Sequence, residues 1–118
     1  MRNFRNYEIW KDGIEIVKAV YMISESLPKD ERFGLKSQIT RAAVSIPSNI
    51  AEGASRNSDL EFKRFLEIAI GSSFELETQL IIINELQLLS PDLLTQMLEK
   101  LETEQKMINK FIGRLKAS

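Results

Sequence analysis

The stretch RAAVSIPSNIAEGASR, residues 41–56, decides the fold because its polar and apolar residues separate onto two sides at helical spacing. The apolar side continues the series Ile39, Ala42, Ile46 and Ile50. The polar side consists of Arg41, Ser45, Ser48, Asn49, Glu52 and Arg56. Pro47 removes one backbone amide and clashes with the carbonyl of residue 43, so we expect the helix to kink there or to split into two pieces.

Helical patterns extend from this stretch to both ends of the chain. Towards the N-terminus, an amphipathic segment ends at Leu27, because a residue before proline is pushed out of the α region. Towards the C-terminus, Ser58 and Glu61 fit a capping box, and Ser90-Pro91-Asp92 fits the start of a further helix. The predicted helices span about residues 7–27, 28–56, 58–89 and 91–116, with Asp30 and Glu31 in the first turn of the second.

These patterns predict an all-α protein. The 118 residues include only five glycines and three prolines, which leaves little turn chemistry for a many-stranded sheet. Four helices with short connections favour an antiparallel up-down-up-down four-helix bundle with a left-handed twist. We expect one domain over residues 1–118.

The chain has no cysteine and no histidine. This composition excludes thiolate nucleophiles, disulfides, Cys/His zinc sites and imidazole bases. We expect no cofactor, no metal and no catalytic residues. No apolar run is long enough for a signal peptide or a membrane span, so a cytoplasmic location without membrane contact is predicted.

The net charge of -1 hides an uneven distribution. Residues 65–104 hold eight acids against Lys100 alone, a balance of -7, while the other residues carry +6. One interpretation is a pair of solvated acidic helices, since long helices need charged outer faces. The other is charge complementarity between copies of the chain or towards an RNA backbone, and the sequence leaves both open.

The third helix has features that match the polar stretch. Its run IGSSFELE places Gly71, Ser72 and Glu75 within about one turn, and a second apolar stripe with Phe74 accompanies its core face. The wide apolar face fits contact with two neighbouring helices or with another subunit. We predict a charge-assisted pair of Arg41 or Arg56 with Glu75 or Glu52, across helices or subunits.

The central residues resemble a known family. The pattern QxxRAAxSIPxNIAEG is present without a gap at 38–53, and AxGSxxELxT follows at 69–78. Both are similar to the four-helix-bundle family named for proteins encoded in intervening sequences of bacterial 23S ribosomal RNA genes. The resemblance implies a bacterial protein that assembles as a ring-shaped pentamer. A related branch serves as the accessory protein of diversity-generating retroelements, alongside a reverse transcriptase and nucleic acid.

The function we predict is a non-enzymatic homo-oligomeric scaffold. Its interface or channel lining would comprise Arg41, Ser45, Ser48, Asn49, Glu52, Arg56, Gly71, Ser72 and Glu75. A plain solvated face is the alternative reading of these residues, although Ser, Asn and Gly are poor helix formers that a solvated face does not need.

Two other functions compete with the scaffold. The first is an RNA- or nucleoprotein-binding module, which would use basic residues including Arg2, Arg5, Lys11, Lys36, Arg41, Arg56, Lys63 and Arg64 and the basic end of the fourth helix. The second is an enzyme in which Glu52, Glu75 and Glu77 act as acids, bases or ligands of a hard metal ion. We disfavour the enzyme, because acids on helical bundles are usually surface or ion-pair groups.

Overall fold

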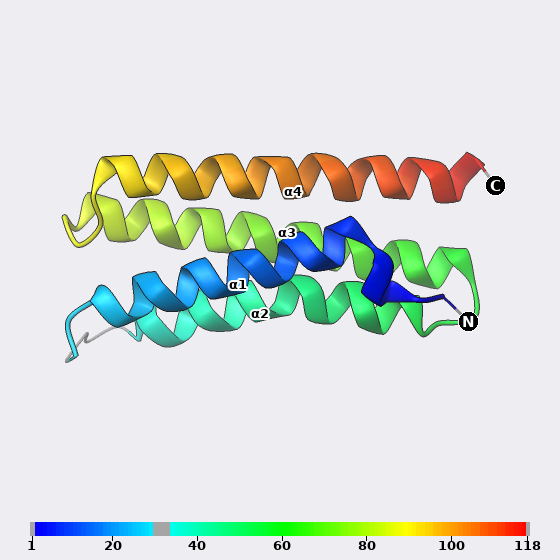
Figure 1. The fold of residues 1–118 in the computed structure, drawn as a ribbon, viewed down its shortest axis with the longest axis horizontal. Coiled ribbons are helices and arrows are strands. Elements are labelled where there is room, and N and C mark those ends of the chain that lie inside the picture. The colour runs from blue at the N-terminus through cyan, green and yellow to red at the C-terminus, as the bar shows by residue number, and fades with distance from the viewer. Residues whose placement is uncertain (1, 30–33, 118) are drawn as a thin grey trace.

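The computed structural model describes residues 2–29 and 34–117, which form four α-helices and one 3-10 turn at the N-terminus (Figure 1). The helices are α1 (Glu8–Ser26), α2 (Leu35–Ala54), α3 (Asp59–Glu85) and α4 (Pro91–Ala117), and the turn spans Phe4–Asn6. Consecutive helices run in opposite directions in a rod of 47 × 22 × 20 Å. The predicted all-α four-helix bundle is confirmed, while its left-handed twist stays a prediction.

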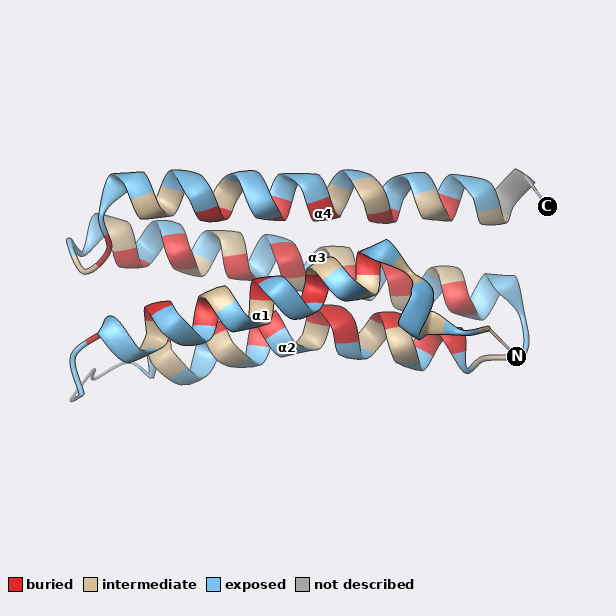
Figure 2. Ribbon diagram, viewed as in Figure 1, coloured by how far each residue is buried: buried red, intermediate tan, exposed pale blue. Residues whose placement is uncertain are grey.

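Each helix buries one stripe against the others, as the inward positions in Figure 2 show. On α2 the stripe includes Ile39, Ile46 and Ile50, all fully buried. Burial of each such side chain contributes about 1.5–3 kcal/mol, so this stripe is a main source of stability. The most extensive packing is between α2 and α3, and α1 packs more closely on α2 than on α4. No described helix has the length and apolar content needed to cross a membrane.

Serine caps set the starts of the last two helices. The Ser58 hydroxyl accepts a 3.1 Å hydrogen bond from the Glu61 amide, and the Ser90 hydroxyl accepts a 3.2 Å bond from the Leu93 amide. Both bonds satisfy amides that have no partner inside their own helix. The predicted serine N-caps are therefore confirmed, while the second bond of the capping box, from the Ser58 amide to the Glu61 carboxylate, stays a prediction.

The start of α2 differs from the prediction. The described residues Pro28 and Lys29 are not helical, and α2 begins at Leu35 after Gly34. Gly34 has a φ of 66°, a left-handed conformation that cannot lie inside a right-handed helix running on from Pro28. The predicted start at Pro28 is wrong, and the expected first-turn acids Asp30 and Glu31 lie outside the described residues.

Pro47 does not divide α2. All residues from Leu35 to Ala54 are helical, so the predicted split is wrong, and a kink stays a prediction. Pro47 is buried and faces α1, where a Cβ on Gly13 would lie 3.2 Å from the Cβ of Pro47. The proline ring therefore fills the contact between α1 and α2 and does not lie among the exposed polar residues of α2. This packing offsets part of the cost of proline in a helix interior.

Candidate assembly interface

The predicted polar residues of α2 fall into two groups by exposure. Arg41, Ser48 and Glu52 are exposed, whereas Ser45, Asn49 and Arg56 are half-buried. The exposed group can reach a partner, although Arg41 and Glu52 also have contacts within the chain, and the half-buried group is already used there.

Ser45 joins α2 to α3. Its hydroxyl shares a 2.7 Å hydrogen bond with the hydroxyl of Ser72. The Asn49 side-chain amide donates to the Ser45 carbonyl at 2.7 Å and to the Ser45 hydroxyl at 2.9 Å. Small polar side chains therefore permit close contact between two helices of one chain, which explains three of the predicted residues without a second copy.

Arg41 of α2 and Arg56, which follows the end of α2, both have partners close by in the sequence. Arg56 Nη2 lies 3.1 Å from Glu52 Oε1, and its guanidinium lies 4.7 Å from the ring centroid of Phe65. Arg41 Nη2 donates a 3.3 Å hydrogen bond to the Ser37 hydroxyl. The predicted pair of Arg56 with Glu52 thus forms locally, between the last turn of α2 and the residues after it, and not across two helices. Among the described residues Glu75 pairs with neither arginine, so its pairing across subunits stays a prediction.

The outer face of α3 exposes apolar side chains around Gly71 and Glu75. Ile68 is 46% exposed, Phe74 is 55% exposed and Ile82 is 44% exposed. Gly71 has open space around it, because a Cβ there would have nothing within 4 Å. The sequence signalled most of this surface, since its second apolar stripe includes Phe74 and Ile81 and its apolar run at 80–89 includes Ile82, whereas Ile68 belongs to neither.

The sequence patterns did not predict that the carboxyl group of Glu104 is buried. The sequence suggested a seam on α4 through Leu98, Leu101 and Gln105, with Gln105 as its polar member. The same seam included Ile108 and Ile112, and the structure buries these two with Leu101; it also buries Met97 and Glu104 of α4. Gln105 is half-buried, and its amide donates a 3.3 Å hydrogen bond to Glu77. The charged residue in the core is therefore Glu104.

Glu104 lies where three helices meet. A Cβ added to Gly13 of α1 would come within 3.3 Å of Glu104 Oε2 and within 3.2 Å of Pro47 Cβ on α2. Burial raises the pKa of Glu104 to about 8, with a smaller contribution from the negative charge of Asp12. Burial also raises the pKa of Asp12, with the Glu8 charge adding to the effect.

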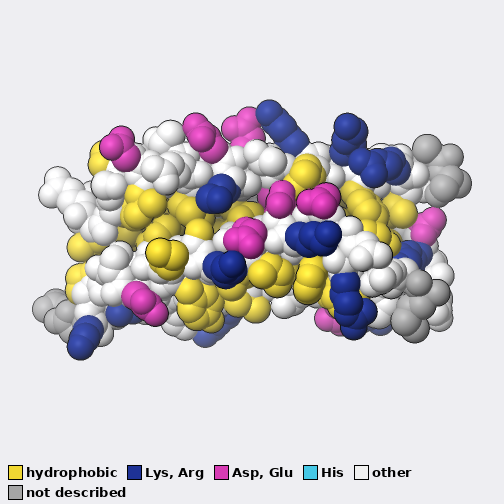
Figure 3. Space-filling model, in the orientation of Figure 1, with side chains coloured by type: hydrophobic (Ala, Val, Ile, Leu, Met, Phe, Trp, Pro, Cys, Tyr) yellow, Lys and Arg dark blue, Asp and Glu magenta, His cyan; other side chains and the backbone are white. Residues whose placement is uncertain are grey.

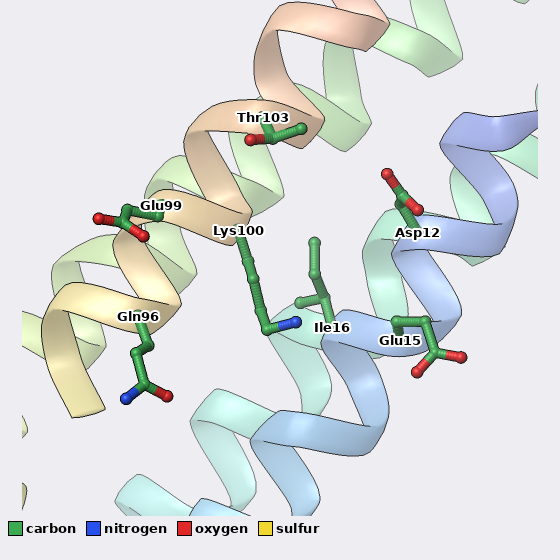
Figure 4. Close-up of a pocket in the computed structure, with 7 residues that line it drawn as sticks. All are labelled: Asp12, Glu15, Ile16, Gln96, Glu99, Lys100 and Thr103. Carbon is green, nitrogen blue, oxygen red and sulfur yellow. The ribbon is translucent and has the colours of Figure 1, made fainter. Parts of the chain in front are cut away.

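A cleft of about 460 Å³ lies between α1 and α4 beside Asp12 (Figure 4). Its lining includes Asp12, Glu15, Ile16, Gln96, Glu99, Lys100 and Thr103. Lys100 extends from α4 towards α1, whereas Glu99 points away from α1. Within the described ranges, no group of three or more carboxylates is arranged to hold a metal ion.

A second cleft of about 410 Å³ lies further along the same two helices. Its lining combines Tyr7 and Phe111, whose ring centroids are 4.9 Å apart, with the basic side chains of Lys110 and Arg114. Figure 3 shows apolar side chains between α1 and α4 and basic side chains over the C-terminal half of α4. The lining also contains the acid Glu8, so this end of the seam is aromatic and carries two basic side chains against one acidic side chain.

Comparison with known proteins gives a family and a fold. The family model described as "23S rRNA-intervening sequence protein" matches residues 5–110. A crystal structure of a protein of unknown function, from the S23 ribosomal protein family of Bacteroides thetaiotaomicron VPI-5482, has a similar fold with a TM-score of 0.82. The two chains are 20% identical, and the match covers 88% of this chain and 97% of the other. No curated protein matches the chain.

Proposed function

The chain belongs to the family of 23S rRNA-intervening sequence proteins, and from this membership we propose that it is a non-enzymatic scaffold that assembles with further copies of itself. The observation that carries the proposal is the apolar outer face of α3, defined by Ile68, Phe74 and Ile82. Exposed apolar side chains grouped on one helix favour contact with another protein surface, since burying them releases water.

The surroundings of this face suit close contact between chains. Gly71 lies between Ile68 and Phe74 in the sequence and leaves room for the backbone of a neighbouring chain. Glu75 and Arg41 are exposed on adjacent helices, and the Ser45–Ser72 bond holds those helices together. An Arg41 guanidinium of one copy would pair with a Glu75 carboxylate of the next, because bidentate arginine–carboxylate contacts are among the stronger polar contacts in proteins.

Such an interface is heterologous, since it joins α3 of one copy to the α2 surface of the next. Heterologous contacts close into rings when the rotation between copies allows it. A pentameric ring, as the family resemblance implies, is the assembly we propose. The exposed residues Ser48 and Glu52 of α2 would then lie at the subunit contact or line the central channel.

The assembly is tested by measuring native mass with light scattering and mass spectrometry at micromolar concentration. The wild type should have five times the 13.6 kDa mass of one chain. Phe74→Lys places a charge on the α3 face and should shift the protein to monomers. Met22→Lys is the matched control, because Met22 is 74% exposed on α1 and should leave the assembly intact. A monomeric wild type would overturn the proposal.

A charge exchange tests the proposed subunit pair directly. Arg41→Glu and Glu75→Arg should each weaken assembly by placing like charges together, and the double variant should restore it. The expected coupling is about 0.5–3 kcal/mol, typical of residues in contact. Independent effects of the two substitutions would exclude the pair but leave the α3 face intact as an interface.

A second candidate function is RNA binding. The observation that favours it is the cleft where Tyr7 and Phe111 lie beside Lys110 and Arg114, since aromatic rings with cationic neighbours suit stacked bases and phosphates. Several of the predicted basic residues already have partners within the chain: Arg2 lies 2.6 Å from Asp59, Lys11 lies 3.8 Å from Glu8, and Arg56 pairs with Glu52. The basic end of α4 is therefore the better candidate contact.

Filter binding of structured RNA at increasing salt tests this second function. Affinity should fall steeply with salt, because phosphate contacts release counterions. Lys110→Ala and Arg114→Ala should each weaken binding and reduce the salt dependence, whereas Lys18→Ala on α1 should change neither. Absence of binding at low salt would exclude the function.

A further inference from the structure

Glu104 is buried without a hydrogen-bond partner. The residue is 0% exposed, and neither of its carboxyl oxygens has a partner among the described residues. An ionised carboxylate in such surroundings is strongly disfavoured, whereas a neutral carboxylic acid is tolerated. The environment therefore selects the protonated form of this side chain.

Within the described residues, no lysine or arginine forms an ion pair with Glu104 that could replace the proton. On α1 the charged neighbour that acts on it is Asp12, which is itself under the influence of Glu8, Glu15 and Lys100. On α2 the junction presents Pro47, which cannot titrate. On α3, Glu77 accepts a hydrogen bond from Gln105 of α4, but it is not among the causes of the raised pKa of Glu104. The negative charge of Asp12 disfavours ionisation of Glu104, and Lys100 makes no ion pair with Asp12 within 4.0 Å in the described chain.

Water has a short route to this junction. Asp12 and Ile16 line the 460 Å³ cleft between α1 and α4, and Gly13, the neighbour of Asp12, lies against Glu104. The contact between α1 and α4 is also the weaker of the two that α1 makes with long helices. Separation of α1 from α4 would therefore expose Glu104 to solvent without disturbing the larger α2–α3 contact.

We propose that Glu104 is a proton-binding site that couples pH to the seam between α1 and α4: the closed seam holds the proton, and the open seam releases it to solvent. Rising pH then favours the open seam. Because the open state exposes the carboxyl group to water, it ionises there at its ordinary pKa. The cleft and the buried side chain thus work as one pH-sensitive device.

The two pKa values of Glu104 set the range of the effect. Its pKa is about 8 in the closed state, against the ordinary value of 4.5 that we assign to the open state. Between these values the closed state holds a proton that the open state lacks, so the opening constant rises about tenfold for each pH unit. Above about pH 8 both states are ionised and the constant levels off.

Infrared spectroscopy tests the proton directly. Wild-type protein at neutral pH should show the carbonyl band of a buried, protonated carboxyl group, and Glu104→Gln should lack that band. Glu102→Gln is the matched control, since Glu102 is an exposed acid on the same helix that pairs with Lys106. A wild type without the band, or a band that remains in Glu104→Gln, would overturn the proposal.

Hydrogen exchange tests the seam. At each pH the exchange of α1 amides is compared between the wild type and Glu104→Gln, so that the intrinsic pH dependence of exchange cancels. The ratio of the wild-type exchange rate to the variant exchange rate should rise about tenfold per pH unit between about pH 4.5 and pH 8 and then level off. The α2 and α3 amides should show no such trend. A constant ratio for α1 would exclude the coupling.

Asp12→Asn keeps the proposal falsifiable if Glu104→Gln fails to fold. Removal of the Asp12 charge should lower the pKa of Glu104, so its infrared band should disappear at a lower pH than in the wild type. Glu8→Gln, one turn earlier on α1, should change the pH at which the band disappears by a smaller amount. Glu8 acts on Asp12 and is not a direct cause of the raised pKa of Glu104. An unchanged band in Asp12→Asn would contradict the assigned surroundings of Glu104.

Discussion

Gly13 of α1 lies against Pro47 of α2, so closely that a Cβ on the glycine would be 3.2 Å from the Cβ and 3.3 Å from the Cδ of the proline. Gly13 and Pro47 are sterically complementary. A proline in a helix interior has a ring that needs space, and a glycine on the facing helix provides it. The same gap admits the carboxyl group of Glu104 from α4.

Gly13→Ala should therefore destabilise the protein, by up to about 2 kcal/mol. Alanine favours helix over glycine by up to about 1 kcal/mol, but its methyl group would meet the rigid proline ring, and such overpacking costs about 1–3 kcal/mol. Gly113→Ala is the control, because nothing lies within 4 Å of a Cβ there and the same change should stabilise α4. Urea unfolding of both variants checks the opposite signs.

Gly53→Ala should be more damaging. A Cβ on Gly53 would lie 2.7 Å from Phe65 Cβ and 2.9 Å from Phe62 Cδ1, distances that require α2 and α3 to move apart. We expect a loss of about 3 kcal/mol, the upper end of the usual overpacking cost. Thermal unfolding should show a fall in Tm well beyond that of Gly13→Ala, and a smaller fall would contradict the packing at the α2–α3 turn.

Ser58→Ala should remove the cap of α3. Loss of the bond from the Glu61 amide to the Ser58 hydroxyl should cost about 1 kcal/mol, measured by chemical denaturation. Ser58→Gly is the control at the same position, since glycine is tolerated as an N-cap and should cost only a few tenths of a kcal/mol. Equal losses in the two variants would show that the hydroxyl contributes little.

Local chemistry accounts for the parts of the fold that the sequence predicted well. The caps at Ser58 and Ser90 act within one turn, and the apolar spacing of Ile39, Ile46 and Ile50 is a property of a single helix. The start of α2 was missed because two local signals competed. Pro28 is suited to a helix start, but the left-handed Gly34 ends any continuity with α2.

The site was harder to predict, because it depends on which helix lies opposite which residue. Ser45 looked like part of an outward stripe, but Ser72 of α3 binds it within the chain. Glu104 looked like one more acid in an acidic block, since a carboxylate at core spacing is indistinguishable in sequence from one beside the core. Only the packing of Gly13, Pro47 and Glu104 shows that this acid is buried.

Stability should decrease as pH rises, because Glu104 binds its proton more tightly in the folded protein than in the unfolded chain. With a folded pKa of about 8 and an ordinary value of 4.5, the folded state carries one extra proton between these values. The contribution of this group is therefore fully present below about pH 4.5 and is lost progressively up to about pH 8. The slope is at most about 1.4 kcal/mol per pH unit.

Urea unfolding of the wild type and Glu104→Gln across this range isolates the effect. Glutamine has nearly the same shape and does not titrate, so the stability difference between the two proteins should change with pH by the slope given above. Glu102→Gln should show the same pH dependence as the wild type. The Glu102 carboxylate is exposed, and the substitution removes only its surface ion pair with Lys106. Parallel curves for the wild type and Glu104→Gln would mean that Glu104 is ionised in the folded protein, and that water or a cation reaches its carboxylate through the α1–α4 cleft.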